Sequence, residues 1–294
     1  MVQDACLRLP NERADVVVRP MAGAYGRGMG LLSGRTALVT GVSRRRGIGF
    51  AVASRLAGLG ADLVVHHWSP HDAEQPWGAD DVPALLTGLR GRLDPGAQLH
   101  DVVLDLAGEH AGEELVAEAV ARAGHLDVLV CNHARSGGDG RLADLSVGAL
   151  DAHWAVNTRS TLMATAAFAA QHDGRPGGRV VWMTSGQALG PMPGEVAYAT
   201  SKAALAGITP TVAAELADRG IGLNTVNPGP VNTGYLDVET ADRPPEVLEA
   251  VLSRFPGGRF GEPDDPARLV AWLVTDDARW VVGQVISTEG GFRR

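Results

Sequence analysis

Cysteines are scarce in this sequence, and long apolar runs and an excess of positive charge are absent. Only two cysteines, Cys6 and Cys131, occur in 294 residues, and no CxxC pair is present, so neither a disulfide framework nor a zinc site is predicted. No stretch approaches the roughly 18 apolar residues that a membrane span needs. The formal net charge of −8 argues against a general nucleic-acid binder, which would normally be basic.

The remaining composition is that of an ordinary globular protein, with 45% hydrophobic and 20% charged residues. Cys131 lies in an apolar run and is expected to be a buried thiol, which fits a reducing, cytoplasmic compartment. The N-terminus lacks the apolar core and small-residue cleavage site of a signal peptide. Residues 1–30 are rich in Gly, Arg and Asp and are predicted to form a flexible N-terminal extension, followed by one domain over residues 31–294.

Short β-branched runs alternate with alanine-rich helical runs from Arg35 onward. The strand-like runs are continuously apolar, which is typical of a parallel sheet covered on both faces. Repeated strand–helix units predict an α/β fold: a single doubly wound, Rossmann-type domain with a parallel seven-stranded sheet. The expected strands are Thr36–Thr40, Ala61–His66, Leu99–Leu104, Asp127–Cys131, Arg179–Thr184, Ile221–Val226 and Val281–Ser287, and the expected helices are Ile48–Leu59, Val82–Leu93, Glu109–Ala123, Val147–Ala170 in one or two pieces, Val196–Asp218 and Pro266–Thr275.

A serine, a tyrosine and a lysine form a candidate proton-transfer unit. Tyr198 and Lys202 lie four residues apart in a predicted helix and therefore share one face. An ammonium held near a phenol favours the phenolate, so Lys202 is expected to lower the pKa of Tyr198. A phenol tuned in this way can donate a proton to an alkoxide or accept one from an alcohol. Ser185, thirteen residues before the tyrosine, completes the unit. The alternative interpretation of Tyr198 is a half-buried aromatic residue on an alanine-rich helix.

The first strand is followed by a glycine-rich turn and then a helix, an arrangement that binds dinucleotide phosphates. Glycines allow a tight turn and close approach of the backbone to a pyrophosphate, and the helix N-terminus adds N–H donors. An ordinary strand-to-helix turn is the alternative interpretation. The predicted phosphate contacts in this turn are Gly41, Ser43, Arg44, Gly47, Ile48 and Gly49.

The choice of nicotinamide cofactor depends on the end of the second strand and on the arginines of the turn. An acidic residue at that strand end would bind the ribose 2′-hydroxyl of NAD and repel a 2′-phosphate. The chain has His66 and His67 there, with no acid before Asp72. Three arginines, residues 44–46, lie in the turn, so NADP(H) is the preferred cofactor, NAD(H) is possible, and His67 is a candidate contact. A solvated turn is the other interpretation of these arginines.

With these motifs in this order, residues 33–294 resemble the short-chain dehydrogenase/reductase family, and its 3-oxoacyl-carrier-protein reductase-like members in particular. The turn departs from the family pattern, because five residues separate its first two glycines where the family usually has three. The resemblance implies a catalytic tetrad of Asn157, Ser185, Tyr198 and Lys202, in which Asn157 supports a water next to the lysine. The cofactor contacts that it implies are Asp105 and Leu106 after the third strand, Asn132 and Ala134 after the fourth, Pro228, Gly229, Val231 and Thr233 after the sixth, and Tyr198 and Lys202 themselves.

The resemblance implies an oxidoreductase that transfers a hydride between NADP(H) and a ketone or secondary alcohol, as a 3-oxoacyl-type carbonyl reductase. An NAD-dependent alcohol dehydrogenase of the same family and a catalytically silent nucleotide-binding scaffold or sensor are the alternatives. The partners would be a small-molecule carbonyl substrate and further copies of the chain in a tetramer or dimer, with no nucleic acid and no membrane. No metal site is expected, because His66, His67 and His71 lack the His-Glu-x-x-His pattern.

Three further segments are predicted to shape the site or its supports. Tyr235–Phe260 is the expected substrate lid, and Trp68–Asp81 is expected to cover the adenosine end. Pro210 falls inside the helix that carries Tyr198 and should kink it near residues 206–210, beyond the catalytic turn. Further candidates for the substrate pocket are His133, Arg135, Gln187 and Met192.

Overall fold

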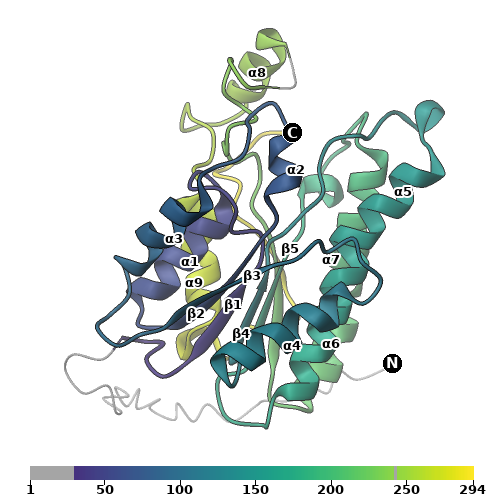
Figure 1. Cartoon of the computed structure of the whole chain (residues 1–294). Coiled ribbons are helices and arrows are strands. Elements are labelled where there is room, and N and C mark those ends of the chain that lie inside the picture. Colours follow the sequence, from purple (N-terminus) through teal and green to yellow (C-terminus); the bar gives the residue numbers. More distant parts are fainter. Residues whose placement is uncertain (1–29, 242–243) are drawn as a thin grey trace, which may run out of the picture.

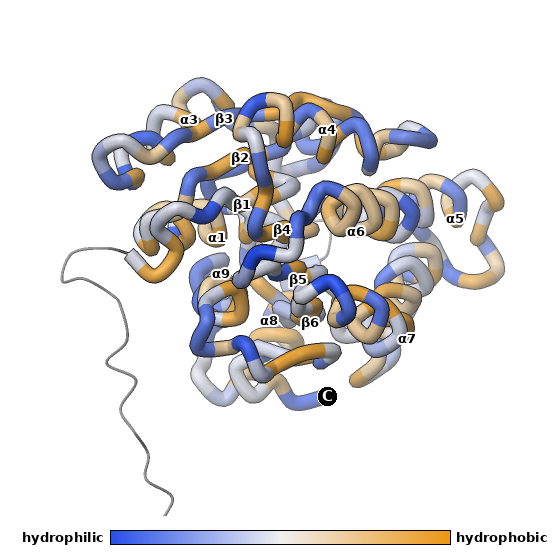
Figure 2. Tube along the Cα trace, turned by 90° about the horizontal axis from the view of Figure 1, so that it is seen from below, coloured by the Kyte–Doolittle hydropathy of each residue, from blue (hydrophilic) through white to orange (hydrophobic). Residues whose placement is uncertain are grey.

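A parallel β-sheet runs through the middle of the molecule, with helices on both of its faces (Figure 1). This computed structural model describes residues 30–241 and 244–294. The predicted flexible extension therefore lies outside the described residues, except for Gly30, which packs against the turn at Leu59. Viewed from below in Figure 2, the strands form a row with helices on both sides. On one side lie α1 (Ile48–Gly58) and α9 (Asp264–Leu273), and on the other α4 (Ala111–Ala123), α6 (Ser160–Gln171) and α7 (Val196–Ala217).

The sheet has seven strands in the order β3-β2-β1-β4-β5-β6-β7, and each neighbouring pair is parallel. The predicted doubly wound α/β fold is thus confirmed. The order reverses between β1 and β4, and ligands of such sheets bind in the crevice at this switch point. The last strand is shorter than predicted because the chain bends at Gly283, whose φ is 73°. The strands are β1 (Thr36–Val39), β2 (Asp62–His67), β3 (Leu99–Val103), β4 (Val128–Cys131), β5 (Arg179–Met183), β6 (Gly222–Asn227) and β7 (Val285–Ser287).

The predicted helices are present, and two additional helices lie in segments that the sequence led us to treat as loops, α2 and α8. The predicted Val147–Ala170 element is divided by a six-residue π-helical turn, η2. Helix α7 continues through Pro210, so the turn that carries Tyr198 and Lys202 is regular. The helices are α1 (Ile48–Gly58), α2 (Ser69–Ala73), α3 (Val82–Arg90), α4 (Ala111–Ala123), α5 (Val147–His153), η2 (Trp154–Arg159), α6 (Ser160–Gln171), α7 (Val196–Ala217), α8 (Pro245–Leu252) and α9 (Asp264–Leu273), with short 3₁₀ turns η1 (Leu142–Asp144), η3 (Gly186–Ala188) and η4 (Asp276–Ala278).

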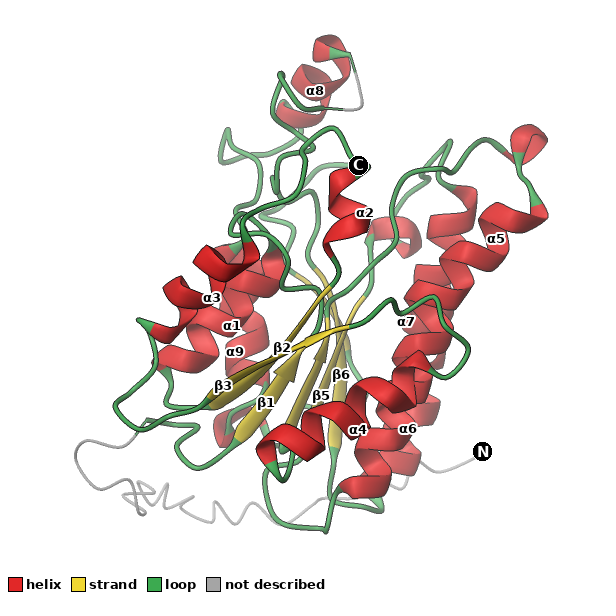
Figure 3. Cartoon of the chain, in the orientation of Figure 1, coloured by secondary structure: helices red, strands yellow, loops and turns green. Residues whose placement is uncertain are grey.

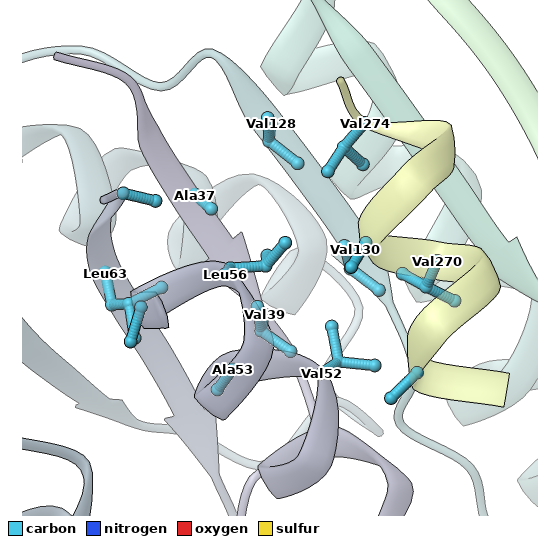
Figure 4. Packing of buried hydrophobic residues seen from close by; sticks show 14 of the residues in the cluster. Ala37, Val39, Val52, Ala53, Leu56, Leu63, Val128, Val130, Val270 and Val274 are labelled. Atoms are coloured by element: carbon cyan, nitrogen blue, oxygen red, sulfur yellow. The ribbon is translucent and has the colours of Figure 1, made fainter. Parts of the chain in front are cut away.

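One hydrophobic core lies between the sheet and helices α1 and α9 (Figure 4). Val39 of β1 and Val130 of β4 pack there against Val52 and Leu56 of α1 and against Val270 of α9, and all five side chains are fully buried. Each buried aliphatic side chain contributes about 1.5–3 kcal/mol to folding. This core fixes α1, and with it the glycine-rich turn at its N-terminal end, against the sheet.

The second core lies on the opposite face, under α4, α6 and α7. Phe168 of α6 and Trp182 of β5 are its largest fully buried side chains with aromatic rings. The indole Nε1 of Trp182 donates to Thr165 Oγ1 at 3.0 Å, which satisfies its only polar group. This packing holds β5 and the helices beside it, so the two elements that carry Ser185 and Tyr198 share one rigid support.

The carboxyl ends of the strands meet at one edge of the sheet, shown at the top of Figure 3. Helix α2, helix α8 and the C-terminal end of the chain all lie on this side of the molecule (Figure 1). The segments predicted to cover the adenosine end and the substrate are therefore both above the edge where a ligand of this fold binds. Within the described residues, no helix has the length and apolar character needed to traverse a bilayer.

Candidate active site

Strand β5 and helix α7 bring the predicted proton-transfer residues together. Ser185 follows the end of β5, and Tyr198 and Lys202 occupy successive turns of α7. The ammonium Nζ of Lys202 lies 5.9 Å from the centroid of the Tyr198 ring and donates to the carbonyl oxygen of Met183 at 3.0 Å. The spacing of four residues therefore places both side chains on one helix face, as the sequence predicted.

The acid–base balance of these residues differs from the sequence prediction in one respect. Burial, together with the charge of Glu195, raises the pKa of Tyr198 to about 12, against an opposing hydrogen bond from Ser185. Burial also lowers the pKa of Lys202 to about 8. The expected lowering of the Tyr198 pKa by Lys202 is thus wrong, because burial disfavours both charged forms.

Asn157 lies in the π-helical turn η2 and is fully buried. Its Oδ1 accepts from the backbone N–H of Arg135 at 2.7 Å, and its Nδ2 donates to the Arg135 carbonyl at 3.1 Å. The same Nδ2 also donates at 2.9 Å to Ser201 Oγ, whose hydroxyl donates to the carbonyl of Tyr198 at 2.7 Å. Asn157 is thus linked through the Ser201 hydroxyl to the backbone carbonyl of Tyr198, and it also anchors the loop that follows β4.

The glycines of the predicted phosphate turn are needed for close packing. Gly41 has a φ of 71°, and a Cβ atom there would lie 2.9 Å from the Cα of His133. A Cβ on Gly49 would lie 2.3 Å from the carbonyl oxygen of Gly41. Asn132 Nδ2 donates to the carbonyls of Thr40 and Gly41 at 3.0 and 3.2 Å. The turn is therefore fixed against the motif that follows β4.

The start of α1 fits a phosphate group. Gly47 is the N-cap residue, and no described side chain caps the helix there. The first turn of α1, residues 48–51, carries no acidic side chain. A helix N-terminus of this kind offers N–H donors and a partial positive charge to an anion. Gly47, Ile48 and Gly49 thus lie at an uncapped helix start without acidic side chains, and their contact with a dinucleotide pyrophosphate stays a prediction.

Each of the three arginines of the turn makes an ion pair with a carboxylate from another segment, and Arg44 is the one whose side chain is largely buried. Arg44 Nε lies 2.9 Å from Asp72 Oδ1, and Ser43 Oγ donates to the same carboxylate at 2.5 Å. Arg46 Nη1 lies 2.6 Å from Asp237, whereas Arg45 is 3.8 Å from its carboxylate partner in the loop before α3. Ser43 and Arg44 are thus both bonded to Asp72, the first acidic residue after the end of the second strand.

Arg44 also reaches across the edge of the sheet to the segment after β6. Its Nη1 donates to the carbonyl of Thr233 at 2.5 Å, and its guanidinium lies 5.2 Å from the centroid of the Trp77 ring. Trp77 in turn meets Tyr235 edge to face, with ring centroids 6.5 Å apart. The segment before α3 and the beginning of the predicted lid are therefore in contact above the phosphate turn.

The remaining predicted cofactor residues lie after the other strands of the same edge. His67 is 7% exposed, and its Nε2 lies 3.3 Å from Asp101 Oδ2. Leu106 is buried beside Asp105, whose carboxylate accepts from the N–H of Ala107 at 2.9 Å. The other positions in this group are Ala134 after β4 and Pro228, Gly229 (φ 69°), buried Val231 and Thr233 after β6.

Two of the residues suggested for the substrate pocket have clear positions. Met192 Sδ lies 3.9 Å from Ser185 Oγ, so it lines the catalytic side of the site. The suggestion for His133 is wrong, because its side chain points into the interior. Its Nδ1 is 2.7 Å from Thr40 Oγ1 and its Nε2 is 2.8 Å from Ser160 Oγ. Burial is the main reason that the pKa of His133 lies well below its usual range.

Sequence reasoning missed Asp139, an acidic residue of the loop that follows β4. Its carboxylate accepts from the backbone N–H groups of Ala197 and Tyr198 at 3.0 and 2.7 Å. Asp139 is separated in the sequence from Ala197 by 58 positions and from Tyr198 by 59. No spacing rule for helices or strands covers such a separation. The one local signal was a single acid in a glycine-rich loop, which by itself indicates only a turn.

Comparisons with known proteins agree with this geometry. Residues 41–293 match the family model described as Enoyl-(Acyl carrier protein) reductase. The chain is 35% identical over 262 residues to the uncharacterized oxidoreductase YjdA of Bacillus subtilis, covering 88% of this chain and 97% of the relative. It is 32% identical over 260 residues to the 3-oxoacyl-[acyl-carrier-protein] reductase FabG of Thermotoga maritima, covering 88% and 98%.

Solved structures give the same result. A short-chain dehydrogenase from Burkholderia cenocepacia, solved in complex with NADP, is 33% identical and superposes with a TM-score of 0.75 over 88% of this chain and 98% of that one. The family model spans both the glycine-rich turn and the segment that carries Ser185, Tyr198 and Lys202. The chain therefore belongs to the short-chain dehydrogenase/reductase family of NAD(P)-dependent oxidoreductases.

Proposed function

We propose that this enzyme is a carbonyl reductase that uses NADP(H) to interconvert a ketone and a secondary alcohol, with a 3-oxoacyl-type compound as the substrate class. The observation that carries the proposal is the position of Ser185, Tyr198 and Lys202 at the sheet edge where the glycine-rich turn also lies. The relative from Thermotoga maritima, named as a 3-oxoacyl-[acyl-carrier-protein] reductase, supports the substrate class.

The bound nicotinamide would supply or accept the hydride. Tyr198, with a pKa of about 12, keeps its proton at neutral pH and can donate it to the oxygen of a carbonyl group. The Ser185 hydroxyl would donate a hydrogen bond to the same oxygen and stabilise the charge that develops there. Lys202 provides a positive charge close to the phenol, and Asn157 would support the water that returns a proton to the site.

Arg44 is the arginine that we assign to the cofactor 2′-phosphate. Its side chain is 16% exposed, compared with 52% for Arg45 and 61% for Arg46. A guanidinium can bind a phosphate with two hydrogen bonds, and the Burkholderia cenocepacia structure contains NADP. Binding would require Arg44 to exchange its ion pair with Asp72 for the phosphate.

The same ion pair is the observation that favours NAD(H) as an alternative cofactor. Asp72 accepts a hydrogen bond from Ser43 in the phosphate turn. An acidic side chain in this region can accept from a ribose 2′-hydroxyl and repels a 2′-phosphate. If Asp72 remains in place when the cofactor binds, the enzyme would be an NAD-dependent alcohol dehydrogenase.

The experiment is cofactor oxidation by the purified protein, with NADPH compared with NADH over a panel of ketones, β-keto thioesters and quinones. We expect turnover that prefers NADPH and is lost in Tyr198→Phe. Tyr235→Phe is the matched control, because it removes a phenol hydroxyl above the same edge and leaves a ring that can face Trp77. A Tyr198→Phe protein with unchanged turnover would refute the assignment of the proton donor.

We also propose that the enzyme acts as a homo-oligomer, a tetramer or dimer, in a cytoplasmic compartment. Val147 on α5 and Trp154 on η2 are large exposed apolar residues, and Trp280 near β7 is 95% exposed. Val147 and Trp154 lie on a helical surface and Trp280 lies near the edge strand, and the family resemblance suggests interfaces between copies of the chain at both places. Most homo-oligomers have closed symmetry. Light scattering on the purified protein measures the mass directly.

A further inference from the structure

The first turn of the catalytic helix is capped by a side chain from a distant loop. The first N–H groups of any helix have no partner within the helix and need an acceptor from outside. The N-cap residue of α7 is Glu195, and its side chain does not cap the helix. Asp139 takes this role, with Oδ1 accepting from Ala197 at 3.0 Å and Oδ2 accepting from Tyr198 itself at 2.7 Å.

The Asp139 carboxylate is ionised at neutral pH and holds its own loop as well. Burial works against the charge, but the backbone N–H groups of Tyr198, Ala197 and Gly140 outweigh it and hold the pKa of Asp139 below its usual range. The Gly140 N–H donates to Oδ1 at 2.7 Å. One side chain therefore joins the loop after β4 to the helix turn that contains the proton donor.

The rest of this loop is fixed at two further points. Near its start, the Asn132 side chain donates to the carbonyls of Thr40 and Gly41 in the phosphate turn. In its middle, Asn157 bonds to both the N–H and the carbonyl of Arg135. Asp139 is the third point. The loop is thus a continuous connection from the phosphate turn, past η2, to Tyr198.

We propose that Asp139 is a positioning residue for the carbonyl reduction. It links the loop on the cofactor side of the site to the helix turn that carries Tyr198, and so sets the position of the Tyr198 hydroxyl. The inference rests on the proposed function, because it assigns a role in that reaction. Its carboxylate sets the position of the first turn of α7 relative to the loop that carries Asn132 and Ala134. A shift of about 1 Å in a reacting group can change turnover by about 100-fold, so this connection would act on kcat.

The variant Asp139→Asn tests the connection with a minimal change in shape. Asparagine keeps one acceptor oxygen and replaces the other with an NH2 group that cannot accept, so one of the N–H groups of Ala197 and Tyr198 loses its acceptor. We expect kcat to fall about 10- to 100-fold, while the KM for NADPH changes less than about threefold, because the phosphate turn is intact. Asp144→Asn, at an exposed carboxylate of the same loop, is the matched control and should leave kcat unchanged.

A second variant separates positioning from simple helix capping. Serine is a favourable N-cap residue whose hydroxyl accepts from the second or third N–H of a helix, and in α7 these belong to Ala197 and Tyr198. Asp139→Asn combined with Glu195→Ser should therefore recover the melting temperature without recovering kcat, because the link to the loop is still missing. Glu195→Ser alone controls for the removal of that charge from the neighbourhood of Tyr198.

The outcomes are distinguishable. Wild-type protein that turns over no carbonyl substrate with either cofactor would refute the proposed function itself. With an active wild type, a low kcat in both Asp139→Asn proteins and a restored melting temperature in the double variant support the positioning role. Unchanged kcat in Asp139→Asn, or kcat that returns together with the melting temperature in the double variant, would overturn it.

Discussion

Replacing Gly49 with alanine should separate the phosphate turn from the helix that follows it. Gly49 is the second residue of α1 and is buried. A Cβ atom at this position would lie 2.3 Å from the carbonyl oxygen of Gly41 and 2.7 Å from Asn132 Nδ2, whereas real Cβ atoms essentially never approach closer than 3.0 Å. The closer neighbour is a backbone atom, so the clash cannot be relieved by rotating a side chain.

The size of the effect follows from what has to move. The turn and the helix must separate until the 2.3 Å contact exceeds 3.0 Å, and forced displacements of this kind in packed interiors cost about 1–3 kcal/mol. In a domain of this length, about 2 kcal/mol corresponds to a loss of about 4–8 °C in melting temperature. The same displacement moves the predicted phosphate contacts, so we expect the Kd for NADPH to rise by about tenfold or more.

The assay is thermal unfolding together with NADPH binding followed by fluorescence. Gly58→Ala is the matched control, because Gly58 ends the same helix and, apart from its chain neighbours and the backbone of its own helix, no described atom lies within 4 Å of the place that its new methyl group would occupy. There the loss of glycine should be neutral or stabilising by about 0.5–1 kcal/mol. A Gly49→Ala protein that melts and binds NADPH like the wild type would refute the packing argument.

Three other predictions concern charge at the site. Lys202→Met should abolish turnover and yet raise the unfolding free energy at pH 7 by about 3 kcal/mol, because burial lowers the pKa of Lys202 from 10.5 to about 8. The wild type, unlike this variant, should gain stability between pH 8 and 10.5, where the unfolded chain keeps the proton that the folded one has lost. Denaturant titrations at about pH 7 and about pH 10 measure both effects. Arg44→Ala should raise the KM for NADPH by about tenfold or more and change that for NADH little, whereas Arg45→Ala, at a half-exposed side chain, should change neither. Alcohol oxidation should accelerate as the pH rises from about 7 to about 9, because it needs the phenolate of Tyr198, whose pKa is about 12; rates that stay flat over this range would contradict the role of that group as base.

Most of the fold could be predicted because each strand is a short apolar run and each buried helix a longer one. Parallel strands covered on both faces cannot be polar on either side, so β1, β4 and β5 are recognisable from composition alone. The exceptions arose where the decisive contacts lie elsewhere in the chain. Helix α2 is five residues long and holds Asp72 over the phosphate turn, and nothing in its own sequence distinguishes it from a loop.

The candidate site divides in the same way. The Tyr198–Lys202 pair could be predicted because the helix repeat alone places both side chains on one face. The partners of Ser43 and Arg44, and the Asp139 cap, depend on distant segments that meet only in the folded chain. The pKa of Tyr198 was predicted in the wrong direction because a sequence gives the neighbouring charge but not the degree of burial, which here has the larger effect.

Burial shifts the two ionisable groups of the site in opposite directions, and both shifts favour the neutral forms. The phenol of Tyr198 holds its proton more tightly, with a pKa of about 12, and the ammonium of Lys202 less tightly, with a pKa of about 8. A phenol that is protonated throughout the neutral range is ready to act as a proton donor, which is the form that carbonyl reduction requires, whereas alcohol oxidation must begin from its rare phenolate. The electrostatics of the site therefore support the reductive direction at neutral pH, and an added positive charge beside Tyr198 would be needed to favour the reverse reaction.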